Sequence, residues 1–486
     1  MFSCDAADES SGLGAHVGCA CHSPQVLSIA RRIQRHLSRR GFIAGVGASL
    51  AALGFAPRAA ADTSDAVRPI VFSNFLMFDG KSSALRGGLR LLVEDGRIKA
   101  LGTNDLSLPD GARTIDCAGR TLMPGLIDAH WHTIFAGLPV SALLAGDIGY
   151  ILIAASAEAE RTLMRGFTTV RDLGGPSFAL KQAIDEGLVA GPRIYPSGAM
   201  ITPSGGHGDL RPLTDLPRMS GGPPSEIERA GGASIADGAD EMRLRVREQI
   251  MQGASQVKLT GSGGVSSPRT TLDMVTFGEA ELRAAVETAS DRQTYVAVHA
   301  YPSAAVGRAV AAGVQCIEHA HLIDEQTARL MADKDVWLST QPFLSEEDTG
   351  PLSGQSQRSA LRVFAGTDTV YNLAKEHRLK TAFGTDLLFS PNLAARQGVM
   401  LTHLRRWYDN ADILRMATGV NGALLALSGP RNPYPGKLGV IEEGALADLL
   451  LVDGDPLTDI GLLANPEKSL LVIMKDGKIY RDARPA

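Results

Sequence analysis

Side chains that bind metal ions recur at the ends of short apolar runs in the middle of this 486-residue chain. These residues are His130, His132, His299, His319 and Asp386. The spacing of two between the first two histidines places both on one face of an extended strand. Imidazole and carboxylate donors without a thiolate suit Zn²⁺, and Mn²⁺, Co²⁺ and Fe²⁺ accept the same donors. The residues therefore predict a centre for divalent metal ions.

A lysine ends a further run of the same kind. Lys258 lies in Val257–Thr260, and a charged lysine buried among strands is costly unless an anion pairs with it. One interpretation is an ion pair with a neighbouring acid. The other is that Lys258 belongs to the metal centre itself.

The elements that must position these residues form an alternating pattern from about residue 123 to 429. The expected strands are Gly125–His130, Thr168–Asp172, Arg193–Ala199, Gln256–Thr260, Thr294–Ala300, Cys316–Ala320, Val336–Gln341 and Thr381–Asp386. Helices are expected at Ala154–Arg165, Glu279–Ser290, Ser303–Ala312, Asp324–Lys334 and Leu393–Trp407. Eight such units predict an α/β fold, a (β/α)8 TIM barrel, in which the carboxyl ends of the strands meet at one mouth. An open doubly wound sheet is the alternative, but no G-x-G-x-x-G follows the first strand.

The two ends of the chain share a different pattern, of short strands separated by Asp-Gly turns. We expect one small β-sandwich built from residues 66–122 and 437–484, with the barrel occupying 123–436. Cys117 and Cys316 are expected as buried thiols rather than as a disulfide.

Loops next to the predicted mouth supply candidates for substrate contact. His207 lies in a glycine-rich loop after the third strand, and Arg211 follows four residues later. Arginine offers carboxylates two parallel hydrogen bonds, so His207, Arg211 and Arg269 are candidates for pairing with a substrate carboxylate.

A second loop, after the fourth strand, contains Gly263 and Gly264, whose amide N–H groups we expect to face an anion. A plain turn is the alternative for this loop. Tyr301 and His321 each lie two residues beyond a strand-end histidine, and we expect both near the mouth. For His321 there are two interpretations, direct contact with a metal ion and a hydrogen bond that supports a metal ligand.

The first 61 residues are typical of an export signal. Arg39 and Arg40 precede an apolar, Gly/Ala-rich run from Gly41 to Ala56, and the cleavage-site residues Ala59–Ala61 follow it. This order predicts a twin-arginine signal peptide that the twin-arginine translocation machinery recognises. The predicted location is the periplasm or the medium. An ordinary N-terminal helix is the alternative.

Composition excludes several classes of protein. The chain is 44% hydrophobic and 21% charged with a net charge of −5, so neither a disordered chain nor a nucleic-acid-binding surface is indicated. No apolar run is long enough for a spanning helix, so no stable membrane anchor is expected. A homo-oligomer is compatible with this composition.

Several motifs together resemble the amidohydrolase superfamily of binuclear metal-dependent hydrolases. These are Pro124-Gly-Leu-Ile-Asp-Ala-His130-x-His132, Lys258, the single histidines His299 and His319, Gly384-Thr-Asp386, and the tail Ala417–Ala423 followed by Gly439–Asp448. The resemblance covers about residues 67 to 481. It implies two divalent ions, with Zn²⁺ favoured, bridged by a carboxylated Lys258.

The resemblance also implies a role for each ligand. His130, His132 and Asp386 hold one metal, and His299 and His319 hold the other. A bridging hydroxide attacks the carbonyl, and Asp386 passes the proton to the leaving amine.

The Gly-Gly-His207-Gly loop, the loop after Lys258 and the His-Ala-Tyr301 segment resemble the imidazolonepropionase-related branch. That branch includes Xaa-Pro dipeptidase-like and carboxypeptidase-like enzymes and amidases for N-acyl amino acids of the ochratoxin type. The expected substrate is therefore a small amide or peptide with a free carboxylate, either a dipeptide or an N-acyl amino acid. Hydrolysis of a cyclic amide or lactone is the alternative, and a non-catalytic periplasmic binding protein is a third interpretation.

Overall fold

The computed structural model describes residues 68–215, 222–267 and 269–485. The predicted signal peptide, residues 1–61, lies outside these ranges. Among the described residues, none of the helices combines the length and the apolar character needed to cross a membrane.

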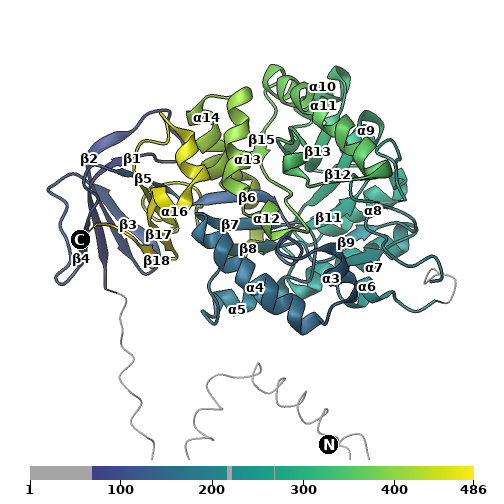
Figure 1. Ribbon diagram of the computed structural model, residues 1–486, viewed down its shortest axis with the longest axis horizontal. Helices are drawn as coiled ribbons and strands as arrows, with labels where there is room; N and C mark the ends of the chain where they lie inside the picture. The colour runs from purple at the N-terminus through teal and green to yellow at the C-terminus, as the bar shows by residue number, and fades with distance from the viewer. Residues whose placement is uncertain (1–67, 216–221, 268, 486) are drawn as a thin grey trace, which may run out of the picture. The chain divides into compact units, whose positions relative to one another are not determined.

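The centre of the described chain is a (β/α)8 barrel, which confirms the predicted fold class (Figure 1). Its strands are β6 (Leu126–Trp131), β7 (Phe167–Asp172), β8 (Arg193–Pro196), β11 (Val257–Thr260), β12 (Val296–Pro302), β13 (Cys316–Leu322), β14 (Trp337–Thr340) and β15 (Thr381–Phe383). Neighbouring strands pair in parallel from β6 to β8 and from β11 to β15. The Ser255 N–H donates to Pro196 O (2.8 Å) between β8 and β11, and the Asp386 N–H donates to His130 O (2.8 Å), which closes the ring.

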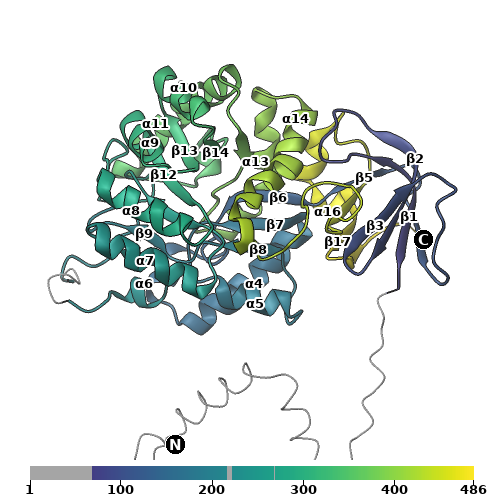
Figure 2. The same ribbon diagram turned by 180° about the vertical axis from the view of Figure 1, so that it is seen from behind.

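Helices pack around these strands, as both sides of the barrel show (Figures 1 and 2). The longer ones are α4 (Ile148–Met164), α5 (Phe178–Asp185), α7 (Ala239–Gln252), α8 (Glu279–Ser290), α9 (Ser303–Ala311), α10 (Glu325–Asp333) and α11 (Gly354–Glu376). The segment expected as one helix from Leu393 is divided into α12 (Pro391–Ala394), α13 (Gln397–His403) and a 3₁₀ turn, η4 (Leu404–Arg406). Short elements near the mouth are α3 (Val140–Ala145), β9 (Met200–Thr202), α6 (Glu226–Arg229) and β10 (Ala233–Ile235).

Strands from both ends of the described chain form one eight-stranded sheet. The first five are β1 (Ile70–Met77), β2 (Arg86–Glu94), β3 (Arg97–Gly102), β4 (Arg113–Asp116) and β5 (Thr121–Pro124). The last three are β16 (Leu449–Val452), β17 (Leu470–Lys475) and β18 (Lys478–Asp482). β16 pairs antiparallel with β5, so the late strands extend the sheet that the early strands begin. Apolar side chains of both groups share one buried core.

A buried ion pair connects this sheet to the barrel. Arg193 on β8 donates from Nε to Asp448 Oδ2 (2.9 Å) and from Nη2 to Asp476 Oδ1 (2.8 Å). Arg193 and Asp448 are both buried, and the two carboxylates raise the pKa of Arg193 against the opposing effect of burial. The pair therefore fixes the sheet against the third strand of the barrel.

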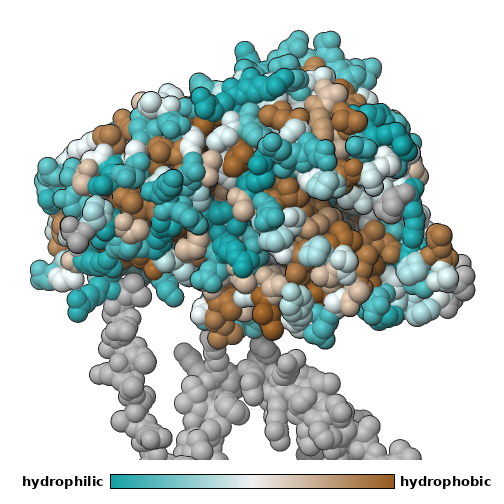
Figure 3. Space-filling view, in the orientation of Figure 1, coloured by the Kyte–Doolittle hydropathy of each residue, from teal (hydrophilic) through white to brown (hydrophobic). Residues whose placement is uncertain are grey.

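The outer surface carries apolar side chains among polar ones (Figure 3). Helices α3 and α4 expose several of them: Val140, Leu144, Ile148, Tyr150 and Ile153. A homo-oligomer stays a prediction, which a measurement of molar mass in solution tests.

Candidate metal centre and active site

The predicted metal ligands come together at the mouth of the barrel. His130 lies on β6 and His132 directly follows it, His299 lies on β12 and His319 on β13, and all four are buried. The His319 ring centroid lies 5.0 Å from that of His130 and 4.3 Å from that of His299. Three strands therefore bring four imidazole donors to one small volume, as the sequence predicts.

On β6, each histidine has one ring nitrogen occupied by a protein acceptor. His130 Nδ1 lies 2.9 Å from Glu318 Oε2, and His132 Nδ1 lies 3.3 Å from Gly174 O. The Gly174 carbonyl keeps the proton of His132 on Nδ1 and leaves its Nε2 lone pair free, whereas His130 Nδ1 also lies 3.2 Å from the amide nitrogen of Gln341. Nε2 of both rings faces Asp386.

The histidines of β12 and β13 are oriented in the same way. His319 Nδ1 lies 2.6 Å from Gln341 Oε1, and its Nε2 is buried without a hydrogen-bond partner. His299 Nε2 lies 3.0 Å from Gly263 O, which leaves its Nδ1 free. Neighbouring polar groups thus orient all four rings, an arrangement typical of metal sites.

Asp386 lies in the turn after β15, not on the strand itself. The strand ends at Phe383, and Asp386 has a φ of +51°. Its Oδ1 lies 3.4 Å from His130 Nε2 and 3.2 Å from His132 Nε2. Gly384 allows this approach, because a Cβ there would lie 2.6 Å from His130 Cβ.

Lys258, on β11, enters the same cluster. Its Nζ lies 3.5 Å from His130 Nε2, and the side chain is buried. Burial lowers the pKa of Lys258 to about 8, although the carboxylates of Glu318 and Asp386 oppose this shift. The alternative interpretation, an ion pair between Lys258 and one neighbouring acid, is not observed, so the amine is available to the cluster.

The donor set fits divalent metal ions. Burial lowers the pKa values of His130, His299 and His319 well below their ordinary range, so these rings are neutral and can bind a cation. His130, His319 and Asp386 each offer one ligand atom, all within 4.8 Å of one another. The unpartnered Nε2 of His319 is a further reason to place a cation here, because a buried polar atom without a partner is costly.

His207, Tyr301 and His321 lie around this cluster. The His207 ring stacks on His299 at 4.4 Å and Tyr301 stacks on His319 at 4.8 Å. Burial lowers the pKa of His207 to about 4 and raises that of Tyr301 above its usual range, so both are neutral. His321 lies 6.3 Å from His319, binds Gln341 O through Nε2 (2.9 Å) and has no partner at Nδ1.

The loop glycines do not form the expected anion site. The Gly263 N–H donates to Met274 O (3.3 Å) and the Gly264 N–H to Thr270 Oγ1 (3.3 Å). Their backbone donors are therefore used within the loop. Gly264 instead leaves space for a ring, because a Cβ at this position would lie 2.4 Å from His207 Cε1.

Arg211 has a carboxylate partner within its own loop. Its Nε and Nη2 donate to the two oxygens of Asp209 (2.8 and 2.6 Å), and Asp209 accepts the Gly205 N–H as well. The guanidinium therefore braces the loop that carries His207, and its charge is already neutralised. Only Nη1 lacks a partner among its nitrogens.

Sequence reasoning missed the residues that support the ligands. Glu318, besides facing His130, accepts from Arg171 Nη2 (2.7 Å), and both side chains are fully buried. Asp128 accepts the His130 N–H (3.0 Å) and the Thr385 hydroxyl (2.6 Å), which ties β6 to the turn that carries Asp386. Charged residues inside apolar strands were the available signal, since such groups are buried only when paired.

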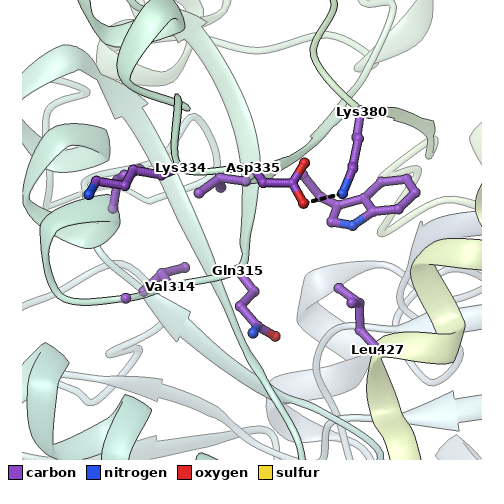
Figure 4. Close-up of a pocket in the computed structure, with 10 residues that line it drawn as sticks. Val314, Gln315, Lys334, Asp335, Lys380 and Leu427 are labelled. Carbon is purple, nitrogen blue, oxygen red and sulfur yellow. Dashed lines mark hydrogen bonds and ion pairs between the residues drawn. The ribbon is translucent and has the colours of Figure 1, made fainter. Parts of the chain in front are cut away.

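A different pocket, of about 300 Å³, lies at the opposite, amino-terminal ends of β13, β14 and β15 (Figure 4). Asp335 and Lys380 within it pair with each other at 2.5 Å. Trp337 and Leu427 also line it. Because this pocket lies at the far end of the barrel and its charged residues pair with each other, it is not part of the metal centre.

A cluster of this kind at the mouth of a (β/α)8 barrel is typical of metal-dependent hydrolases. Comparison with known proteins gives the particular group. Residues 121–480 match the sequence profile of the Amidohydrolase family, and the chain belongs to that family.

Individual relatives are similar over most of their length. Ochratoxinase of Aspergillus niger is 29% identical over 444 residues, 87% of this chain and 89% of the relative. A prolidase solved with N-methylphosphonate-L-proline is 32% identical with a TM-score of 0.78, covering 85% of this chain and all of that one. A Xaa-Pro dipeptidase with bound methionine is 27% identical, with a TM-score of 0.73 and the same coverage. The chain is therefore a hydrolase of amide or peptide bonds, which sets aside the interpretation as a binding protein.

Proposed function

We propose that the chain is a binuclear metal-dependent amidohydrolase that cleaves dipeptides or N-acyl amino acids with a free carboxylate. The observation that carries the proposal is the cluster of four buried imidazoles, from His130, His132, His299 and His319, with Lys258 and Asp386. Ochratoxinase, prolidase and Xaa-Pro dipeptidase relatives support this substrate class.

The ligands divide into two groups. His130, His132 and Asp386 would hold one ion, and His299 and His319 the other. Lys258, as a carbamate, would bridge the two, and its lowered pKa favours the neutral amine that carboxylation requires. When bound, the two ions supply an acidic water molecule and polarise the substrate carbonyl.

The remaining steps belong to this chain's own side chains. Asp386 is the carboxylate among the proposed ligands, and its side chain is 17% exposed. It can therefore reach both the attacking water and the leaving group. It accepts the proton of that water and donates it to the leaving nitrogen. His207 and the neutral Tyr301 hydroxyl lie against the rings of His299 and His319, where they can donate hydrogen bonds to the substrate.

The test is a substrate panel on Zn²⁺-loaded protein, with bound metal measured in parallel. We expect about two ions per chain, and hydrolysis of N-acetyl amino acids and dipeptides but not of the same compounds with the carboxylate amidated. Equal rates on the amidated compounds would remove the carboxylate requirement. A cyclic amide and a lactone in the same panel test the alternative function, ring opening. Turnover of these two compounds alone would favour that alternative.

We also propose that the enzyme is exported through the twin-arginine pathway to the periplasm or medium. Cys117 and Cys316 are both free and buried, so folding before export needs no oxidant. Replacing Arg39 and Arg40 with lysine should leave active enzyme in the cytoplasm, measured by fractionation. Normal export of that variant would contradict the proposal.

A further inference from the structure

Two phenylalanines lie side by side at the barrel mouth, each three residues beyond a predicted metal ligand. Phe135 follows His132, and Phe389 follows Asp386. Their ring centroids are 6.4 Å apart with the planes at 30°. The Phe135 ring is also 6.0 Å from the His132 ring, with the planes at 23°. The two rings therefore form an aromatic surface beside His132 and Asp386.

Backbone hydrogen bonds hold the two rings together. The Phe389 N–H donates to Phe135 O (3.0 Å), and the Ser390 N–H donates to Ala136 O (3.2 Å). These bonds join the loop after β6 to the loop after β15. Neither loop can move without displacing the other, so the aromatic surface is preformed.

Two features separate this pair from ordinary packing. Both side chains are only half-buried, whereas a phenylalanine retained for the core is normally covered. Phe389 also has a φ of +61°, in the left-handed region that bulky residues rarely adopt. Backbone strain of this kind concentrates at sites that bind ligands.

The position of Phe135 and Phe389 relative to the predicted metal ligands determines which part of the substrate they can contact. Phe135 lies against the His132 ring, whereas His207 and Tyr301 stack on His299 and His319. Asp386 must lie within hydrogen-bond distance of the leaving nitrogen to protonate it. Substituents of that nitrogen therefore lie nearest to Phe135 and Phe389.

We propose that Phe135 and Phe389 bind the side chain of the leaving amino acid and select for aromatic or branched aliphatic residues at that position. The inference rests on the proposed function, because it uses the role given there to Asp386. Apolar surface without a charged group on these two rings favours an apolar partner over a polar one.

The test compares kcat/KM for two pairs of substrates on the Zn²⁺-loaded enzyme. N-acetyl-L-phenylalanine against N-acetylglycine varies the amine side, and N-benzoylglycine against N-acetylglycine varies the acyl side. In Phe389→Ala and Phe135→Ala we expect the first ratio to fall about tenfold, the scale of a lost aromatic contact, and the second ratio to hold. Competitive inhibition by L-phenylalanine should weaken in the same variants.

Two further variants separate a loss of selectivity from a loss of stability. Phe389→Gly removes the ring and fits the positive φ without strain, so it should lose selectivity while its melting temperature is kept or raised. Phe364→Ala removes a half-buried phenylalanine on α11 and should leave both ratios unaltered.

The outcomes distinguish this inference from the function beneath it. If the wild type hydrolyses the N-acyl amino acids but Phe389→Ala and Phe389→Gly keep the first ratio, the selectivity role is wrong and the function stands. A change in the second ratio alone would place the rings on the acyl side and overturn the inference. No turnover of any substrate in the panel would refute both.

Discussion

Replacing Gly264 with alanine should disable the site without removing its metal ligands. The added Cβ would lie 2.4 Å from Cε1, 2.5 Å from Nδ1 and 2.7 Å from Nε2 of His207. Ordinary contacts begin near 3.4 Å, so the ring must move by about 1 Å. A misplacement of about 1 Å at a reacting centre costs about 100-fold in rate, and we expect a loss of that order in kcat/KM.

The assay combines steady-state kinetics with bound metal and melting temperature. A matched control is Gly307→Ala in α9, where a Cβ would meet nothing within 4 Å and alanine favours the helix. The reasoning predicts that Gly264→Ala keeps its metal and fold, while Gly307→Ala keeps its activity as well. Full activity in Gly264→Ala would show that the exact position of His207 is unimportant.

Three further changes test other parts of the structure. Lys258→Ala should lose bound metal and activity, with partial rescue by short carboxylic acids; metal analysis showing wild-type content would contradict the bridging role. Asp386→Asn should lower kcat by about 100-fold or more, the scale of general acid–base catalysis, with its circular dichroism unchanged; near-normal turnover would remove this residue from proton transfer. Asp448→Ala should destabilise the fold by about 3 kcal/mol, at the lower end for a broken buried pair, because Asp476 still faces Arg193; urea denaturation measures this, and an unchanged midpoint would refute it.

The barrel strands could be predicted because parallel strands are buried on both faces and appear as apolar runs. Helix α11 (Gly354–Glu376) was not expected from its sequence. Its buried positions include Ser359, Gly366 and Thr367, so polar residues and a glycine interrupt the apolar period of its inner face. The reason is close packing, since a Cβ at Gly366 would lie 2.1 Å from His321 O.

In the site, too, features set by residues close in sequence could be predicted, whereas contacts between distant segments could not. Each predicted metal ligand lies on a barrel strand or within three residues after it, so strand positions alone were sufficient to group them. The prediction for the Gly264 amide was wrong because its partner, Thr270, comes from a later part of the loop. The contact of Glu318 with His130 depends on which strands face each other across the barrel, which spacing along the chain does not give.

The pairing of β5 with β16 also sets the order in which this protein can be completed during synthesis. The Thr121 hydroxyl donates to Gly454 O across 333 residues of chain. The early strand β5 therefore completes its pairing only after β16 has been synthesised. A nascent chain that stops before β16 leaves one edge of β5 open, and such unpaired edges invite aggregation. Folding of the sheet is therefore finished only when nearly the whole chain has left the ribosome. A translocase that accepts folded chains would, for this enzyme, also select for full-length ones.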